Sequence, residues 1–393
     1  MFALGLAVGA AGCSLGGAPP SPFSAQPAFS RNWISPIARE HPLVGRIFDV
    51  SSERWASREE LARAIVAADV VLLGEQHDNA DHHQIQALLL TDLLGAGRRP
   101  VVAFEQINLE DQAALDAAVA GAERARVDLA GADGGVRSSG DTNGVREAAD
   151  WAIEGSLAVA KAAGWDRSGW PPFEQYQPIF VTALGAGLPL RAANLSRAAL
   201  ADKTAIPEAA TQSTTAPVVL SGAARASLAA EIEESHCGYA VPEMVDAMVE
   251  AQRRRDDAMA TVILSSLGGA NGAASATAGQ ARATRTHGEA RTTRASATKG
   301  QGTDGVVLIS GFGHARRGYG VPLHLSAQRP ELRVVSVALV EVVPDRTAPL
   351  SYAELLHAQH LPFDFVIFTP RADDEDACEK FRASLEKMRA PRP

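Results

Sequence analysis

The chain is poor in aromatic side chains and in positive charge. Aromatic residues make up 5% of its 393 residues while alanine and glycine are abundant, so we expect part of the chain to lie outside any hydrophobic core. The formal net charge of -9 argues against a nucleic-acid-binding protein, because phosphate contacts need a basic surface. The length is sufficient for one large domain or two smaller ones.

Cysteine is also scarce, and the first cysteine follows an apolar N-terminal run. This run is too short to cross a bilayer but suits the apolar region of a signal peptide. It ends in small residues before Cys13, which resembles the lipobox of bacterial lipoproteins. We therefore interpret residues 1–13 as a lipoprotein signal segment with Cys13 lipidated, and residues 14–40 as a flexible tether. This predicts a lipid-anchored protein of the bacterial cell envelope, at the outer membrane facing the periplasm. An ordinary cleaved signal peptide and an apolar arm are the alternatives.

The other two cysteines, Cys237 and Cys378, are the thiols that remain in the exported protein. An oxidising compartment favours a disulfide between them. They could equally be buried and free, and the sequence does not decide between these two states.

Short β-branched runs alternate with helix-like segments along most of the chain. The clearest runs are residues 70–73, 101–104 and 306–309, and a glycine or a polar side chain follows closely after each. Such runs are typical of buried parallel strands. The sequence therefore predicts an α/β fold with a mainly parallel β-sheet flanked by helices.

We expect residues 41–393 to form one such domain. A smaller helical subdomain is predicted for about residues 140–260, and its last helix is expected to end near Leu267. Residues 268–302 are rich in Ala, Gly, Thr, Ser and Arg and lack large apolar side chains. Such a segment cannot bury enough apolar surface to offset its ordering entropy, so we predict a disordered insertion.

Polar side chains stand at the ends of four predicted strands. They are Glu75 with His77, Glu105, Asn194 and His314. Ligands of open α/β sheets bind beyond the carboxyl ends of the strands, so these side chains are expected to converge on one site. Each could instead cap a helix or lie in a turn, which is the common fate of a single residue of this kind.

Further histidines and arginines lie close to these positions in the sequence. His82 and His83 stand at a predicted helix start, where the helix dipole favours the neutral imidazole that a metal or haem iron requires. Arg316 and Arg317 follow His314 and could clamp carboxylates. An amphipathic helix carries Arg255 and Asp256, and one of these two could face inward and complete the site. For all of these residues, a solvated surface position is the alternative.

Taken together, several motifs resemble the ChaN family of haem-binding lipoproteins of iron uptake, which is related to the Tiki/TraB and erythromycin-esterase superfamily. The segments that carry the resemblance are residues 71–79, 103–106, 236–238, 251–260, 310–316, 320–322 and 363–365 with Cys378. The resemblance implies a parallel-sheet domain with a smaller helical part and haem held between the two subunits of a homodimer. It also implies outer-membrane haem uptake machinery as a partner.

Our main hypothesis is therefore a membrane-tethered haem-binding protein of haem and iron uptake. Glu75, His77, Glu105, His314 and Arg255 would surround the haem. Arg316 or Arg317 would approach the propionates, and a histidine or a tyrosine would reach the iron. The tyrosine candidates are Tyr176, Tyr239 and Tyr319.

A metal-dependent hydrolase is the alternative hypothesis, because the wider superfamily carries the same motifs. His77, His314 and Glu105 would then hold a divalent metal such as Mn, Co or Zn, and Glu75 would act as general base or ligand. A third interpretation is a scaffold in which these residues only hold the sheet edge together.

Overall fold

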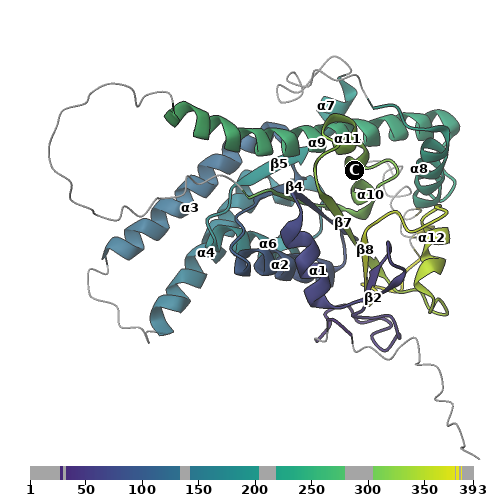
Figure 1. Ribbon diagram of the computed structural model, residues 1–393, viewed down its shortest axis with the longest axis horizontal. Coiled ribbons are helices and arrows are strands. Elements are labelled where there is room, and N and C mark those ends of the chain that lie inside the picture. Colours follow the sequence, from purple (N-terminus) through teal and green to yellow (C-terminus); the bar gives the residue numbers. More distant parts are fainter. Residues whose placement is uncertain are drawn as a thin grey trace, which may run out of the picture.

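The computed structural model describes residues 27–29, 32–132, 142–202, 218–278, 304–376, 378–379 and 382 (Figure 1). The strands are β1 (Ile47–Asp49), β2 (Arg54–Ala56), β3 (Val70–Glu75), β4 (Val101–Asn108), β5 (Leu190–Asn194), β6 (Val306–Gly311), β7 (Val334–Glu341) and β8 (Phe365–Thr369). The helices are α1 (Arg58–Ala67), α2 (Ala80–Gly95), α3 (Gln112–Ala132), α4 (Thr142–Ala162), α5 (Trp165–Ser168), α6 (Phe173–Gly185), α7 (Arg197–Ala201), α8 (Gly222–Ser235), α9 (Pro242–Ala278), α10 (Phe312–Ala315), α11 (Val321–Gln328) and α12 (Tyr352–Leu355).

The strands form one eight-stranded sheet in the order β2-β1-β8-β7-β3-β6-β4-β5. All pairs from β8 to β5 are parallel, whereas β1 runs antiparallel to both β8 and β2. The mainly parallel α/β fold predicted from the sequence is therefore confirmed. In this order β6 lies between β3 and β4, although it follows them by about two hundred residues, and the carboxyl ends of these three strands meet.

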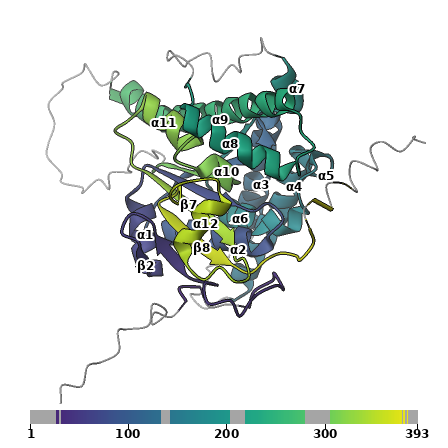
Figure 2. The ribbon, with the colours of Figure 1, turned by 90° about the vertical axis from the view of Figure 1, so that its right-hand side faces the viewer.

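Helices cover both faces of the sheet, so alternate strand residues enter two separate cores. Val71 and Leu73 belong to the core that α1, α2, α4 and α6 complete. Val70 and Leu72 belong to the core that α9, α10, α11 and α12 complete. Figure 2 shows α8, α9 and α11 together at the top of the molecule, and Figure 1 shows α3 and α4 projecting as a pair from its left side.

The predicted boundaries need two corrections. The domain begins before residue 41, because Phe29 and Ser35 are buried and Ile37 bridges to Arg371, so at least this part of the predicted tether packs on the domain. Helix α9 runs to Ala278 rather than ending near Leu267. Cys13, the signal segment and the rest of the predicted insertion lie outside the described residues.

The region of residues 140–260, predicted as a smaller helical subdomain, is mostly helical and packs on the sheet. Strand β5 lies within it and pairs with β4, and Trp151 of α4 and Ile179 of α6 are part of a core on the sheet. Within the described residues, α8 and the first half of α9 form a further small core, in which Leu228, Val245 and Val249 pack with Tyr319 from the segment after α10. Helix periodicity alone could not separate these two groups, because it does not tell which core a helical face enters.

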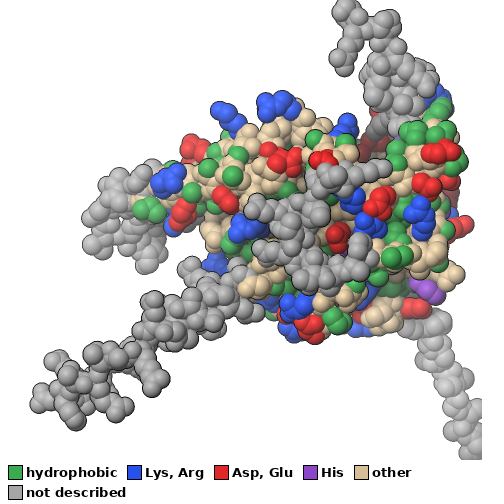
Figure 3. All heavy atoms as spheres, turned by 90° about the horizontal axis from the view of Figure 1, so that it is seen from above, with side chains coloured by type: hydrophobic (Ala, Val, Ile, Leu, Met, Phe, Trp, Pro, Cys, Tyr) green, Lys and Arg blue, Asp and Glu red, His purple; other side chains and the backbone are tan. Residues whose placement is uncertain are grey.

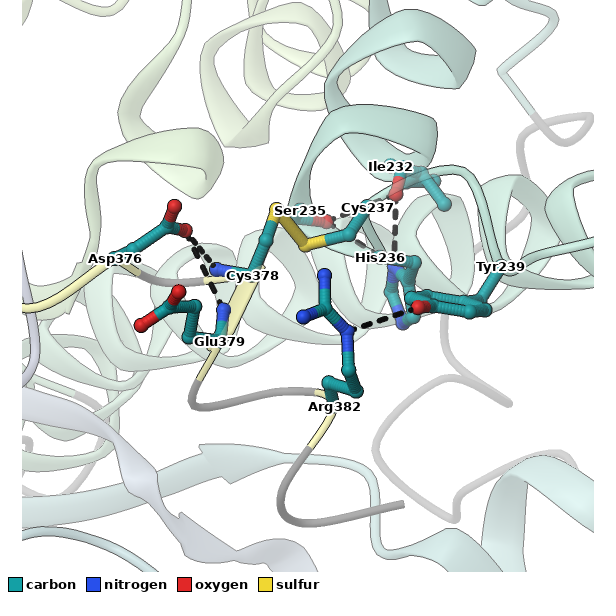
Figure 4. Close-up of a disulfide and its surroundings, with 9 residues drawn as sticks. All are labelled: Ile232, Ser235, His236, Cys237, Tyr239, Asp376, Cys378, Glu379 and Arg382. Atoms are coloured by element: carbon teal, nitrogen blue, oxygen red, sulfur yellow. Dashed lines mark hydrogen bonds between the residues drawn. A yellow bond between two sulfur atoms is a disulfide. The ribbon is translucent and has the colours of Figure 1, made fainter. Parts of the chain in front are cut away.

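Cys237 and Cys378 form a disulfide, one of the two states that the sequence left open. Cys237, just after α8, and Cys378, in the C-terminal segment, have Cα atoms 5.5 Å apart (Figure 4). A second contact joins the same two segments, because Arg382 Nε donates to the hydroxyl of Tyr239 at 3.2 Å. The disulfide thus holds the C-terminal segment against the end of α8.

The surface of the described residues gives two further facts. Acidic and basic side chains are interspersed over the face seen in Figure 3, so neither sign dominates the described part of that face. Among the described helices, none combines the length and the apolarity that a bilayer crossing requires.

Replacing both Cys237 and Cys378 with serine should destabilise the protein. The bond closes a loop with a sequence separation of 141 residues. The chain-entropy model gives about 5 kcal/mol as the upper estimate of its contribution for a loop of this length. Thermal unfolding followed by circular dichroism should show a melting temperature several degrees lower than that of the oxidised wild type. Equal melting temperatures would show that the bond does not constrain the unfolded chain.

Candidate functional site

The ends of β3, β4 and β6 meet around one cavity of about 640 Å³. The register of β3 and β6 places Glu75 opposite Gly311, so His77 and His314, which follow these residues, reach the same cavity. The cavity is lined by Glu75, Gln76, His77, Asp78, Glu105, Gly169, Trp170, Pro171, Glu231, Ser235, Gln252, Gly311, Phe312, Gly313 and His314. The predicted convergence of the strand ends is therefore present for Glu75, His77, Glu105 and His314.

Glu75 is the buried centre of one half of the site. Its Oε1 accepts hydrogen bonds from the hydroxyl of Tyr176 at 2.6 Å, from Gln106 Nε2 at 3.0 Å and from His77 Nδ1 at 3.0 Å. Its Oε2 lies 3.4 Å from Nε2 of the buried His83. Burial alone would raise the pKa of Glu75, but His83 and His77 outweigh it and hold the pKa of this carboxyl below its usual range. Glu75 is therefore an anion that only accepts hydrogen bonds.

His77 presents its second ring nitrogen to the cavity. Because the Glu75 carboxylate only accepts, Nδ1 of His77 carries the hydrogen of that bond. Within the described residues Nε2 has no hydrogen-bond partner, and the side chain is 38% exposed. The edge of the ring packs against Trp170, with the ring centres 4.8 Å apart. Burial lowers the pKa of His77. The hydrogen bond to Glu75 and the charge of Glu105 together raise it by more than burial lowers it, so the pKa of His77 lies above the usual value.

Gly311 leaves the space in which the His77 ring lies. A Cβ atom at this position would come within 2.9 Å of Cε1 and 3.0 Å of Nε2 of His77. Distances this short force one of the groups to move. Gly311, at the end of β6, therefore leaves room for the ring of His77, which follows β3.

His314 has both ring nitrogens bound to carboxylates. Nδ1 lies 2.6 Å from Asp256 Oδ1, and Nε2 lies 3.1 Å from Glu105 Oε1. Burial lowers the pKa of His314, but the charges of Glu105 and Asp256 outweigh it and raise the pKa to about 10. Two acceptors require two N–H donors, so His314 is an imidazolium held between two carboxylates. Glu105 also accepts from the backbone N–H of Gly311 at 2.7 Å.

His82 and His83 lie beneath the site and do not line the cavity. Nδ1 of His82 accepts from the backbone N–H of Gln76 at 2.8 Å, and Nε2 lies 2.7 Å from the hydroxyl of Thr369. Burial, followed by the charge of His83, lowers the pKa of His82 to about 3, so it is neutral as expected. Both histidines are completely buried, so the solvated alternative is wrong for them.

The arginines do not take the positions that we expected. Arg316 is buried and donates to Glu231 Oε2 and to the carbonyl oxygen of Leu356, both at 2.6 Å. Arg317 pairs with Asp364. Neither lines the cavity, because α10 ends at Ala315 and the chain then turns away from it. The predicted clamp on propionates is therefore absent at these two residues.

Helix α9 contributes Asp256 to the site rather than Arg255. Asp256 is fully buried and bonds to His314, as described above. Arg255 is half-buried and feels the charge of Glu105, yet burial is the larger effect and lowers its pKa. Arg255 does not line the cavity. The hypothesis of an inward-facing residue on this helix was correct in Asp256 and wrong in Arg255.

The tyrosine candidates differ in exposure. Tyr176 and Tyr319 are buried, and their hydroxyls bond to the carboxylates of Glu75 and Glu231. Burial and the charge of Glu75 raise the pKa of Tyr176 far above its usual range, so it remains a neutral phenol. Tyr239 is half-exposed and lies at the turn between α8 and α9. Asn194 does not line the cavity.

Several cavity residues were not predicted to line the site. Gln252 lies one helical turn before Asp256 on α9, and this spacing was visible in the sequence. Trp170 belongs to an aromatic and proline-rich stretch, and the sequence did not predict where its side chain would point. Glu231 carries no sequence signal, because its place depends on how α8 packs.

The described residues contain no group of three or more His, Cys, Asp and Glu side chains arranged to hold a metal ion. The predicted metal set of His77, His314 and Glu105 is therefore close together, yet it is not arranged as a metal site.

Replacing His314 with glutamine should change how stability depends on pH. The pKa of His314 is about 10 in the folded protein and 6.5 without its surroundings. A raised folded-state pKa contributes stability that is complete below the lower value and is lost as pH rises through the upper one. Urea midpoints of the wild type should therefore fall between about pH 6.5 and pH 10 relative to those of the variant. If the urea midpoints of the two proteins change with pH in the same way, His314 is not a stabilising imidazolium in the folded protein.

Comparison with known proteins gives one family and three similar structures. The family described as haem-binding uptake, Tiki superfamily, ChaN matches residues 61–325. ChaN of Campylobacter jejuni, solved as a study of cofacial haem binding, is similar with a TM-score of 0.52 and 19% identity, covering 82% of this chain and 95% of that one. The type III effector HopBA1 is less similar, with a TM-score of 0.36 and 12% identity over 79% of this chain and 92% of that one.

A mutant of the erythromycin esterase EreC in its open conformation has a TM-score of 0.31 and 11% identity, with 81% of this chain and 95% of that chain covered. No curated protein matches the sequence. The likeness to ChaN supports the fold seen here, and the family match spans more than half of the chain. The chain therefore belongs to the haem-binding uptake family of the Tiki superfamily, the family of ChaN.

Proposed function

We propose that this protein binds haem in the cavity at the ends of β3, β4 and β6, with Nε2 of His77 facing the iron. The observation that carries this proposal is the pairing of His77 Nδ1 with the buried Glu75 carboxylate at 3.0 Å, while Nε2 faces the cavity. Metal-ligating histidines usually donate their other N–H to a carboxylate in this way. Family membership supports haem as the ligand.

The cavity fits the iron side of a haem better than its propionate side. Its volume of about 640 Å³ lies in the range of small-molecule sites, and Trp170, Pro171 and Phe312 supply apolar surface for a porphyrin. No lysine or arginine is among its lining residues. Inside the cavity the propionates would meet Glu75, Glu105 and Glu231 without a free cationic partner, because His314 is already held between Glu105 and Asp256. The propionates would therefore extend toward the opening. Bound haem would supply an iron centre, while the protein orients it.

The metal-dependent hydrolase is not supported by a specific observation. His314 donates from both nitrogens to carboxylates, and the described residues hold no metal-type group of side chains. The open Nε2 of His77 is compatible with a proton acceptor, but the structure gives no observation that assigns it this role. Haem binding is therefore the function that the site supports best.

We extend the proposal to the cellular role. The lipobox-like approach to Cys13 supports a lipid anchor at the outer membrane facing the periplasm. The family description supports a role in haem uptake, with uptake machinery of the outer membrane as partner. The solved ChaN of Campylobacter jejuni binds haems cofacially, and we propose that two copies of this chain likewise meet around haem.

Titration with haem tests the central proposal. The wild type should develop a Soret band that saturates, and His77→Ala should weaken binding at least about tenfold. Gly311→Ala should do the same without removing the imidazole, because a Cβ there meets the His77 ring. His360→Ala, at an exposed histidine outside the cavity, is the matched control and should bind as the wild type does.

The outcome also locates the ligand. A wild type that takes up no haem would reject the proposed function. If the Soret band is unchanged in His77→Ala but lost in Tyr239→Phe, the protein binds haem, but the iron lies at Tyr239 in the turn after α8 rather than at His77.

Lipidation of Cys13 has its own test. Expressed in a bacterium that lipidates exported proteins, the wild type should fractionate with membranes because acyl chains anchor it. Cys13→Ser should appear in the soluble fraction instead. The amount of wild type in washed membranes, set against Cys13→Ser, is the measurement. Recovery of the unmodified wild type in the soluble fraction would reject the anchor.

A further inference from the structure

A buried network lies directly beneath His77, and the proposed haem contact makes no use of it. It consists of Glu75, Gln106, His83 and Tyr176. We propose that Tyr176 is a positioning residue: its hydroxyl fixes the carboxylate of Glu75, which in turn fixes the His77 ring with Nε2 toward the cavity. This inference rests on the proposed function and concerns the residue that prepares the same site for its ligand.

One oxygen of the Glu75 carboxylate, Oε1, accepts three hydrogen bonds. Oε1 accepts the Tyr176 hydroxyl at 2.6 Å, which is the shortest of its contacts, while the bonds from Gln106 and His77 are each 3.0 Å long. Hydrogen bonds from a hydroxyl to a carboxylate are among the strong ones. The side chain of Glu75 has no exposed surface, so solvent does not take over when one of these donors is lost.

Tyr176 is itself held rigidly. It is fully buried on α6, and its ring lies 3.8 Å from that of His83 and 5.1 Å from that of Trp165, measured between ring centres. Its hydroxyl also lies 3.4 Å from the backbone carbonyl oxygen of His77. Tyr176 thus stands next to both the carboxylate partner and the main chain of His77.

The opposite side of the His77 ring offers less constraint. The His77 ring contacts Trp170 edge to face, and 38% of the side chain is exposed. Gly311 contacts the ring only in its present orientation, so it would not hold a ring that has rotated away. The bond from Nδ1 to Glu75 is the only hydrogen bond of the ring within the described residues. A carboxylate that rotates would therefore release the ring.

Tyr176→Phe removes the hydroxyl and keeps the aromatic packing. Loss of a hydrogen bond behind a metal-ligating histidine typically lowers affinity 10- to 100-fold, so we expect the dissociation constant for haem to rise about tenfold. Tyr352→Phe is the matched control, because Tyr352 is also buried and its hydroxyl bonds only to backbone at Val343 and Arg346. This control should bind haem as the wild type does.

A double-mutant cycle separates positioning from a general loss of structure. If Tyr176 acts through His77, Tyr176→Phe should have no further effect on haem affinity in the His77→Ala background. An equal loss in both backgrounds would show a merely structural role and overturn the inference. Melting temperatures of all variants provide the check on folding.

A readout without haem keeps the inference testable on its own. In the ligand-free wild type, ¹⁵N NMR above the pKa of His77 should show the tautomer with hydrogen on Nδ1, because Glu75 accepts from that atom. Tyr176→Phe should give a mixture of both tautomers, and Tyr352→Phe should not. An unchanged tautomer in Tyr176→Phe would refute the positioning role. A wild type that shows the Nδ1–H tautomer and its loss in Tyr176→Phe, yet takes up no haem, would reject the proposed function alone.

Discussion

The cavity depends on one constraint, which is that the carboxylates of Glu75 and Glu105, buried at the ends of β3 and β4, need compensating polar partners. An uncompensated buried carboxylate costs several kcal/mol, and no lysine or arginine lines the cavity. Imidazoles meet the need instead: His77 and His83 face Glu75, while His314 faces Glu105. The order β3-β6-β4 is what brings these groups together, because β6 pairs with both strands and His314, which follows β6, reaches Glu105.

The same local motif has two different chemical outcomes. His77 and His314 both follow a buried strand that ends near a glycine, yet His77 has one carboxylate partner and an open nitrogen, whereas His314 has two partners and none. Asp256 on α9 makes the difference, because it occupies the second nitrogen of His314. A nitrogen that is already bound cannot contact a ligand. Only one of the two motifs therefore presents a lone pair to the cavity, and the other supplies fixed positive charge.

The sequence predicted the sheet and the convergence of its strand ends, because buried parallel strands leave a continuous β-branched pattern and end at one edge. It could not predict the roles of Arg316 and Arg317. Their place depends on the length of α10 and on α8, whose Glu231 takes up Arg316. Tyr176 was one of three tyrosine candidates for the iron ligand, and its hydroxyl bonds to Glu75 from a buried position on α6. Composition and spacing indicate which residues could take part in a site. The contacts that these residues make depend on how the helices pack, which the sequence alone does not give.

Electrostatics also orients the ligand that we propose. The carboxylates around the cavity repel the propionates of a haem, and the fixed arginines nearby are already paired with Glu231 and Asp364. The same negative surroundings favour the positive charge of a ferric iron centre. Both effects would act in the same direction, since they would place the metal of the proposed haem inward toward His77 and its propionates outward toward the opening. In the function that we propose, this orientation would leave the propionates at the surface, where a second copy of the chain could reach them.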